Sequence, residues 1–362
     1  LLAGAHVRIV SLGSGSMKQS DPQNLRVPAM RLVSELLPAG TRAGVWLFGE
    51  NTSELVTPST VDDQWRAGAR ERISDIHSRG LFTHIERAID AATAGWEAEA
   101  DPGDRHIVLL TDGVVDVSKN ANESAASRAR ILAAQLQRVR SFGARIHAVA
   151  LSDNVDKELL QALTETTGGL LEQADSAERL QRIFLHMLEQ TAAPMTVPLQ
   201  GKQFDLDSSV TEVTLLIFRA QAEPVVLITP NGQRLTLSEP NEGVAWRSEA
   251  GYDLITVNSP AAGTWRFEGA EDPDNRAVVV TDLAIDMDPI PGTLLASEVI
   301  DLNAWMTEHG TPLEQLDLAQ LIRAEVRIEA DGMAPVAGLM PLNPQTFKFE
   351  SRLDGRSLPA GE

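Results

Sequence analysis

Short apolar runs alternate with longer amphipathic segments through the first half of the chain. Apolar runs of about four to eight residues predict buried strands, whereas apolar residues spaced three and four apart predict helices. The predicted strands are Val7–Leu12, Gly44–Gly49, Arg105–Leu110, Ala144–Leu151 and Gly169–Glu172, with Ser53–Thr57 as a short edge strand. The predicted helices are Gln23–Leu37, Val61–His77, Ile85–Trp96, Asn122–Phe142, Lys157–Thr166 and Ala177–Gln190. This alternation indicates an α/β domain with a doubly wound, mainly parallel sheet and helices on both faces.

The pattern changes at Pro194, after which β-prone runs follow one another without helices between them. The predicted strands are Val210–Phe218, Val225–Thr229, Arg234–Leu237, Tyr252–Val257, Thr264–Glu268 and Ala277–Leu283, a spacing typical of an antiparallel β-sandwich. Beyond a proline-containing linker at 288–292, three more strands are predicted, at Ser297–Thr307, Leu321–Ala330 and Thr346–Leu353. We therefore expect an α/β domain at 1–193, an all-β sandwich at 194–290, and a small or partial Ig-like β-rich domain at 291–362.

The chain is acidic, with 31 Lys and Arg against 51 Asp and Glu and a formal net charge of −20. This balance argues against nucleic acids and anionic membrane surfaces as partners, because both require clustered cations. The absence of cysteine excludes disulfides and thiolate chemistry. No apolar stretch approaches the ~20 residues of a membrane span. Ala3 and Ala5 resemble the end of a secretory signal, although an arbitrary start of the sequence fits equally well. Membrane anchoring of a longer form is left open.

Small hydroxyl residues follow the first predicted strand, in Gly13-Ser14-Gly15-Ser16. Thr83 stands at the entrance of one predicted helix, and Asp112 follows the strand Arg105–Leu110. Because the carboxyl ends of parallel strands share one edge of the sheet, we expect these side chains to lie close together. Hydroxyl and carboxylate oxygens are the ligands that Mg²⁺ prefers. The structural alternatives are helix or turn capping by the serines and Thr83, and a strand-ending turn at Asp112.

On the basis of these four residues and the order of its predicted elements, the first domain resembles a von Willebrand factor type A (VWA) domain. The metal-ion-dependent adhesion site of that family combines a D-x-S-x-S turn with a threonine and a later aspartate. Ser14 and Ser16 match the two serines, Thr83 the threonine and Asp112 the aspartate. The resemblance implies a Rossmann-like fold, a Mg²⁺, Mn²⁺ or Ca²⁺ ion at these four residues, and a partner protein whose carboxylate completes the metal shell. More widely, the chain resembles exported bacterial proteins in which such a domain precedes β-sandwich modules.

The chain departs from that motif at Leu12, which stands where the family has its first aspartate. One of two carboxylates that balance the charge of the cation is therefore missing. Loss of an outer-shell partner lowers metal affinity about 10–100-fold, and loss of a charged ligand should have at least that effect. We expect a metal site that is weak or vacant. Without a metal, the Gly13–Ser16 turn beside Lys18 has a minor alternative role in anion binding.

Together these features favour a non-enzymatic protein-binding, adhesion or assembly module that uses the carboxyl edge of the sheet. The sequence has no G-x-S-x-G or G-x-x-x-x-G-K-[S/T] motif, and its seven histidines lack zinc-ligand spacing. The alternatives are a structural or envelope-assembly subunit without metal, and an accessory VWA subunit of a motor or chelatase-type enzyme complex. The sandwich modules favour an exported, periplasmic or cell-envelope location, whereas the accessory-subunit alternative is cytoplasmic.

Overall fold

The computed structural model of the chain describes residues 5–98, 104–192, 194–219, 224–239, 241–281, 283–288, 298–308, 311–313, 324–328 and 336–357. A six-stranded sheet with the order β3-β2-β1-β4-β5-β6 forms the centre of the first domain. Its strands are β1 (His6–Leu12), β2 (Arg42–Phe48), β3 (Thr52–Thr60), β4 (Arg105–Thr111), β5 (Arg145–Ala150) and β6 (Leu171–Gln173). All run parallel except β3, which pairs antiparallel with β2. The predicted doubly wound, mainly parallel sheet is confirmed.

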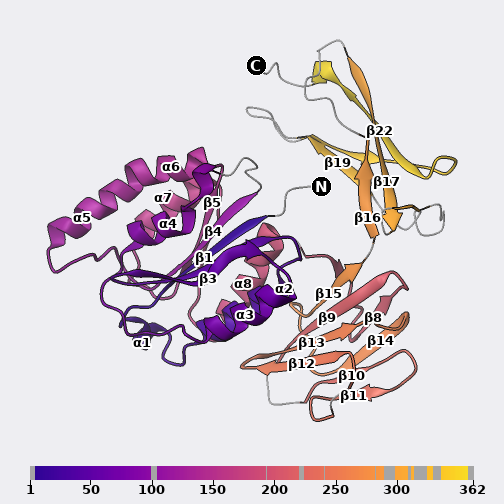
Figure 1. Cartoon of the computed structure of the whole chain (residues 1–362), viewed down its shortest axis with the longest axis horizontal. Coiled ribbons are helices and arrows are strands. Elements are labelled where there is room, and N and C mark those ends of the chain that lie inside the picture. Colours follow the sequence, from indigo (N-terminus) through magenta and orange to yellow (C-terminus); the bar gives the residue numbers. More distant parts are fainter. Residues whose placement is uncertain are drawn as a thin grey trace.

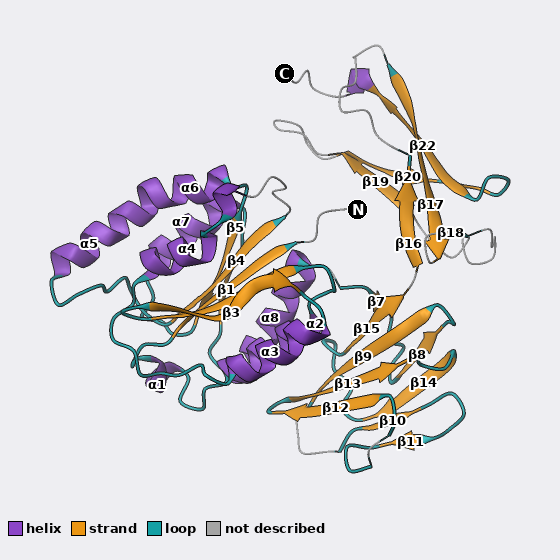
Figure 2. Ribbon diagram, viewed as in Figure 1, coloured by secondary structure: helices purple, strands orange, loops and turns teal. Residues whose placement is uncertain are grey.

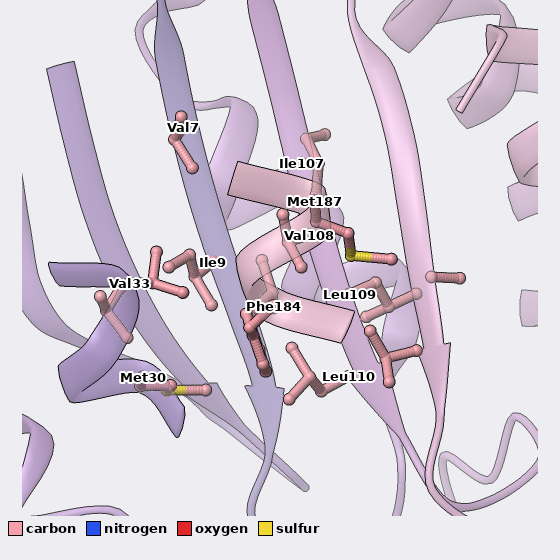
Figure 3. Close-up of a cluster of buried hydrophobic side chains, with 14 of the residues drawn as sticks. Val7, Ile9, Met30, Val33, Ile107, Val108, Leu109, Leu110, Phe184 and Met187 are labelled. Atoms are coloured by element: carbon pink, nitrogen blue, oxygen red, sulfur yellow. The ribbon is translucent and has the colours of Figure 1, made fainter. Parts of the chain in front are cut away.

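Helices cover both faces of this sheet (Figure 1). On one face lie α2 (Arg26–Leu36), α3 (Asp63–Ile73) and α8 (Ala177–Thr191). On the other lie α4 (Ile85–Thr93), α5 (Ala121–Arg130), α6 (Leu136–Ser141) and α7 (Lys157–Thr167). Figure 3 shows the resulting core, in which side chains of β1 and β4 pack against Met30 and Val33 of α2 and Phe184 and Met187 of α8. The central strands are fully buried because helices cover them on both sides.

Two elements of this domain differ from the predictions. The strand predicted at Ser53–Thr57 extends over the nine residues of β3, most of which are exposed. An exposed edge strand has too few buried positions for apolar residues to mark its ends. The predicted helix Asn122–Phe142 is interrupted by a π-helical turn, Ile131–Gln135, between α5 and α6. Hydrophobic spacing does not distinguish a single π turn from the α-helix around it.

The second region is an antiparallel sandwich of two sheets, with the orders β11-β10-β14-β8 and β12-β13-β9-β15-β7 (Figure 2). Its strands are β7 (Thr196–Val197), β8 (Gln203–Leu206), β9 (Val210–Phe218), β10 (Val226–Ile228), β11 (Arg234–Leu235), β12 (Val244–Glu249), β13 (Tyr252–Asn258), β14 (Gly263–Glu268) and β15 (Arg276–Thr281). Strands β7, β8 and β12 were not predicted. Two of them are very short, and β12 is an edge strand without a continuous apolar run.

The third region contains a sheet with the order β16-β17-β22-β21 and a separate pair, β19-β20. Its strands are β16 (Leu283–Met287), β17 (Val299–Glu308), β18 (Thr311–Pro312), β19 (Ala324–Ile328), β20 (Val336–Met340), β21 (Leu342–Asn343) and β22 (Lys348–Asp354). The strand predicted at Ala277–Leu283 is divided, because β15 ends at Thr281 and Leu283 begins β16 in the next sheet. No described helix of the chain has the length and apolar character to cross a bilayer.

The sandwich packs directly on helices α2 and α8 of the first domain. The buried core of that domain continues into β9 and β13 through Leu216, Phe218, Tyr252 and Leu254. The Tyr252 hydroxyl, in a side chain that is 1% exposed, donates to the Pro28 carbonyl in α2 over 2.8 Å. Ion pairs Arg31–Glu249 and Arg182–Asp272, at 3.0 and 2.7 Å, flank this contact. The two domains therefore share one apolar core across their junction.

A pair of buried histidines lies near the amino ends of β4 and β5. His106 Nδ1 and His147 Nε2 are 3.0 Å apart, and the two rings stack. His147 Nδ1 accepts from the Leu170 N–H over 3.3 Å, so neutral His147 carries its proton on Nε2 and donates it to His106. On the far side, His106 Nε2 lies 3.2 Å from the Asp104 carboxylate. Burial, His106 and Arg145 lower the pKa of His147 to about 4, and Asp104 only partly opposes them.

This pair predicts a loss of stability in mild acid. Between pH 6.5 and about 4, the unfolded His147 binds a proton that the folded residue does not. The free energy of unfolding therefore decreases as the pH is lowered through this range. This stabilisation is fully present above pH 6.5, and about 3 kcal/mol of it has been lost once the pH has fallen to 4. His147→Gln should remove this part of the pH dependence, measured by urea unfolding at a series of pH values. An unchanged slope of stability against pH in His147→Gln would contradict the assignment.

Candidate functional site

Three loops meet at the carboxyl edge of the six-stranded sheet, beside the short helix α1 (Met17–Ser20). The loop after β1 is paired with the loop before α4, because Gly15 N–H donates to the Gly80 carbonyl and Gly80 N–H to the Gly13 carbonyl, both over 2.8 Å. The second loop is paired in turn with the loop after β4, since Thr83 N–H donates to the Asp116 carbonyl over 2.6 Å. Sheet order reverses between β1 and β4 at this place, which is where open α/β sheets bind ligands.

The Asp112 carboxylate is the centre of a hydroxyl cluster at this edge. Ser16 Oγ donates to Asp112 Oδ1 over 2.8 Å, and Ser20 Oγ donates to Asp112 Oδ2 over 2.7 Å. Ser14 Oγ lies 2.6 Å from Ser16 Oγ and extends the network. Ser152 Oγ donates to the backbone carbonyl of Asp112 over 2.6 Å. Both carboxylate oxygens of Asp112 therefore have hydroxyl donors within the chain.

Thr83 lies beside this cluster without a side-chain hydrogen bond to it. The side chain is 6% exposed, and its Oγ1 lies 3.8 Å from where a Cβ on Gly113 would stand. The N-cap of α4 is His84, whose Nδ1 accepts from Arg87 N–H over 3.5 Å, so the capping alternative for Thr83 is not what the structure contains. Ser16 stands at the N-cap of α1 but makes no side-chain capping bond. The structure thus brings Ser14, Ser16 and Asp112 into contact and places Thr83 next to them.

Leu12 and Arg26 occupy the floor of the site. Leu12 is 0% exposed and belongs to the apolar core. Its carbonyl oxygen accepts from Arg26 Nη1, and Arg26 Nε donates to Asp21 Oδ2 over 2.8 Å. Arg26 Nη2 also donates to Ser78 Oγ over 2.8 Å, so one guanidinium joins the first two loops. Burial lowers the pKa of Arg26, while its hydrogen bond to Asp21 and the charges of Asp21 and Asp112 raise it.

The residues present do not form a charge-balanced shell for a divalent cation. They supply hydroxyl oxygens and one carboxylate, whose two oxygens already accept hydrogen bonds from serines. No cluster of three or more His, Asp or Glu side chains suited to a metal occurs among the described residues. The buried guanidinium of Arg26 adds a positive charge close enough to interact with Asp112. A cation bound here would therefore lack the second carboxylate that usually offsets its charge.

Sequence reasoning missed Ser20 and Arg26, although each carried a signal. Ser20 follows Ser16 by four residues, a spacing that places both hydroxyls on one face of a helix. Arg26 precedes Met30 by four residues and Val33 by seven, so it lies on the apolar face of its own helix. A charged residue on the apolar face of a helix is rarely buried unless an oppositely charged or hydrogen-bonding group is buried with it.

Two exposed apolar side chains lie on the loops next to the cluster. Leu81, in the loop before α4, is 63% exposed, and Val114, in the loop after β4, is 52% exposed. Between the second of these loops and α5 lies a groove of about 610 Å³, lined by Phe82, Val114 and Lys119 among others. Both exposed apolar residues of the first domain that are this large thus lie on loops of this edge, among the residues that the structure describes.

The comparisons with known proteins agree with this fold. Residues 9–185 match the family model of the von Willebrand factor type A domain. A UPF0353 protein of Mycolicibacterium vanbaalenii is 27% identical over 204 residues, which is 51% of this chain and 60% of that protein. The match thus spans about three fifths of this curated relative.

Two solved structures are similar at low identity. A von Willebrand factor type A protein from Catenulispora acidiphila is 14% identical with a TM-score of 0.44, and the match covers 97% of this chain and 66% of that one. Proximal thread matrix protein 1 of the mussel byssus, described with a zinc-occupied metal-ion-dependent adhesion site (MIDAS) motif, is 16% identical with a TM-score of 0.41. That match covers 53% of this chain and 46% of the mussel protein. The first domain of this chain is a VWA domain, and antiparallel β-sheets follow it.

Proposed function

We propose that this chain is a non-enzymatic protein-binding module. Its partner binds at the carboxyl edge of the VWA sheet, and a divalent cation contributes little to the affinity. The observation that carries the proposal is the position of Leu81 and Val114, two exposed apolar residues on loops that flank Asp112. Burying apolar surface favours association and needs no metal. The hydrogen bonds within the Ser16, Ser20 and Asp112 cluster supply a formed, polar centre for that surface.

Metal plays a reduced part in this proposal because of the residues at the floor of the site. Leu12 cannot donate an oxygen from its side chain, and Arg26 brings a positive charge where a cation would need a negative one. We place the interaction outside the cytoplasm, in the cell envelope or beyond it, since β-sandwich modules suit a role in spacing or contact. Cell fractionation of the source organism tests that location, and a purely cytoplasmic protein would favour the accessory-subunit alternative.

Charge substitutions on the edge test the binding proposal. Leu81→Asp and Val114→Asp should each weaken partner capture at least about tenfold, because an unpaired charge buried in an interface costs about 2–5 kcal/mol. Leu237→Asp is the matched control, since Leu237 is 53% exposed but lies in the sandwich. Tagged protein is incubated with source-cell extract, with EDTA and with Mg²⁺, and captured proteins are quantified by mass spectrometry. The proposal is wrong if the edge variants retain the same proteins as the wild type.

A further inference from the structure

A pocket of about 680 Å³ opens at one end of the β-sandwich, outside the VWA domain. Its walls come from the β10–β11 turn, the loop before β12 and the β13–β14 turn, so both sheets contribute. Its floor is the end of the sandwich core, where Leu235, Val257 and Trp265 are 3%, 6% and 2% exposed. A volume between roughly 300 and 1,000 Å³ is the size of ordinary small-molecule sites.

The loops around this pocket are held in place by their own hydrogen bonds. Gln233 N–H donates to Thr229 Oγ1 over 3.0 Å within the first turn. Gln233 Nε2 donates to Asn241 Oδ1 over 3.3 Å and so joins two walls of the pocket. On the third wall, Trp265 Nε1 donates to the Ala261 carbonyl over 2.9 Å. A ligand would therefore meet a rim that is largely formed before binding, which reduces the entropy lost on association.

Several polar groups on the rim are uncommitted. The carboxamide of Asn258, the hydroxyl of Ser259 and the carboxylate of Glu242 line the pocket and make no side-chain hydrogen bond with any described residue. Asn231 accepts a bond from the Thr229 hydroxyl through its Oδ1, which leaves its Nδ2 group available. The pocket thus offers amide and hydroxyl donors beside amide and carboxylate acceptors.

We propose that this pocket binds a neutral saccharide. A sugar hydroxyl both donates and accepts hydrogen bonds. A carboxamide such as that of Asn258 or Asn231 can pair with it in both ways, because it has a donor NH₂ group and an acceptor oxygen. Pro230, an exposed residue of the first wall, offers C–H surface to the apolar face of a sugar ring. The described lining contains no Lys, Arg or His, and it contains Glu242, so a phosphate or a sugar acid is disfavoured by charge.

A saccharide fits this pocket better than a peptide segment does. Peptides in extended form bind mainly through the backbone of an open strand edge, whereas here the available groups belong to side chains on loops. The described lining presents no aromatic face to the ligand, because Trp265 is 2% exposed. Affinity for a single sugar or disaccharide should accordingly lie in the millimolar range, and several copies of the chain on a surface would strengthen it by multivalency.

Saturation-transfer difference NMR of the whole chain tests the proposal, with glucose, maltose, cellobiose and N,N′-diacetylchitobiose as neutral probes and glucuronic acid as the charged counterpart of glucose. At least one neutral probe should bind, and glucuronic acid should give no signal. Asn258→Ala should weaken that binding about tenfold, since it removes hydrogen bonds without touching the core. Asn122→Ala, an exposed carboxamide on α5, is the matched control and should leave binding unchanged.

Three results would overturn the assignment. The first is the absence of a signal from every neutral probe while the variants and the wild type melt at the same temperature. The second is binding that Asn258→Ala does not weaken, because the saccharide would then lie elsewhere on the chain. The third is a signal, sensitive to Asn258→Ala, from the peptide triglycine in place of the sugars, which would assign the pocket to peptides. Each result is independent of whether a protein partner binds the VWA edge.

Discussion

Arg26→Leu is expected to lower the free energy of unfolding by about 3–5 kcal/mol. Arg26 is 0% exposed, and its guanidinium is the charge partner of Asp21, which is 7% exposed. Removing the guanidinium leaves a buried carboxylate without its counterion and the Leu12 carbonyl without its side-chain donor. Both losses occur under the loops of the site, so the change should also loosen their arrangement. Urea unfolding followed by tryptophan fluorescence measures the effect.

Two further variants separate the charge pair from a general effect of losing an arginine. Arg87→Leu makes the same substitution at an exposed position and should change stability by less than about 0.5 kcal/mol. Adding Asp21→Asn to Arg26→Leu removes the orphaned charge and should restore part of the loss, as a double-mutant cycle would register. A single variant Arg26→Leu as stable as the wild type would show that the pair contributes little.

Leu12→Asp is expected to tighten binding of Mg²⁺ and Mn²⁺ by about 10–100-fold relative to the wild type. The new carboxylate would supply the negative charge that the present hydroxyls and Asp112 lack. Position 12 is fully buried, so the variant should be less stable than the wild type in EDTA. Added Mn²⁺ should then raise its melting temperature, because a ligand that binds only the folded state stabilises it. Titration calorimetry and thermal melting together measure both effects.

Leu12→Asn is the matched control for this variant, because it introduces a polar side chain of similar size without the charge. Its metal affinity should stay close to that of the wild type. Adding Asp112→Asn to Leu12→Asp should abolish the gain, since no carboxylate pair would remain. Low-micromolar Mg²⁺ binding by the wild type would contradict the proposed weak metal site. Equal affinities of Leu12→Asp and Leu12→Asn would mean that the charge at position 12 is not what limits binding.

These expectations describe a VWA domain whose edge is stabilised from within. The Asp112 carboxylate accepts bonds from Ser16 and Ser20, and Arg26 ties the neighbouring loops together beneath it. The adjoining sandwich contacts the same helix that begins with Arg26, through the bond from Tyr252 to Pro28. The carboxyl edge of the sheet and the sandwich are thus connected by a single helix, α2, and by a shared apolar core.

The sequence by itself determined the order of strands and helices in the first domain and the edge at which its polar residues gather. A continuous apolar run such as Ile107–Leu110 is typical of a strand buried on both faces, so its structure follows from local pattern. Parallel strands place Ser14, Ser16 and Asp112 at one edge of the sheet, and the pairing of β1 with β4 brings them together there. The departure at Leu12 was likewise visible in the sequence.

Only the tertiary structure decided which groups satisfy one another at that edge. The bond from Ser20 to Asp112 joins residues 92 positions apart, and the one from Arg26 to Ser78 spans 52 positions. Local pattern carries no information about such pairings, because a hydroxyl or guanidinium can bond any suitable group that folding brings near it. For the same reason, the apolar face of a helix does not determine which other element of the chain packs against it. That α2 is covered by Tyr252 and its neighbours from the sandwich depended on how the two domains pack.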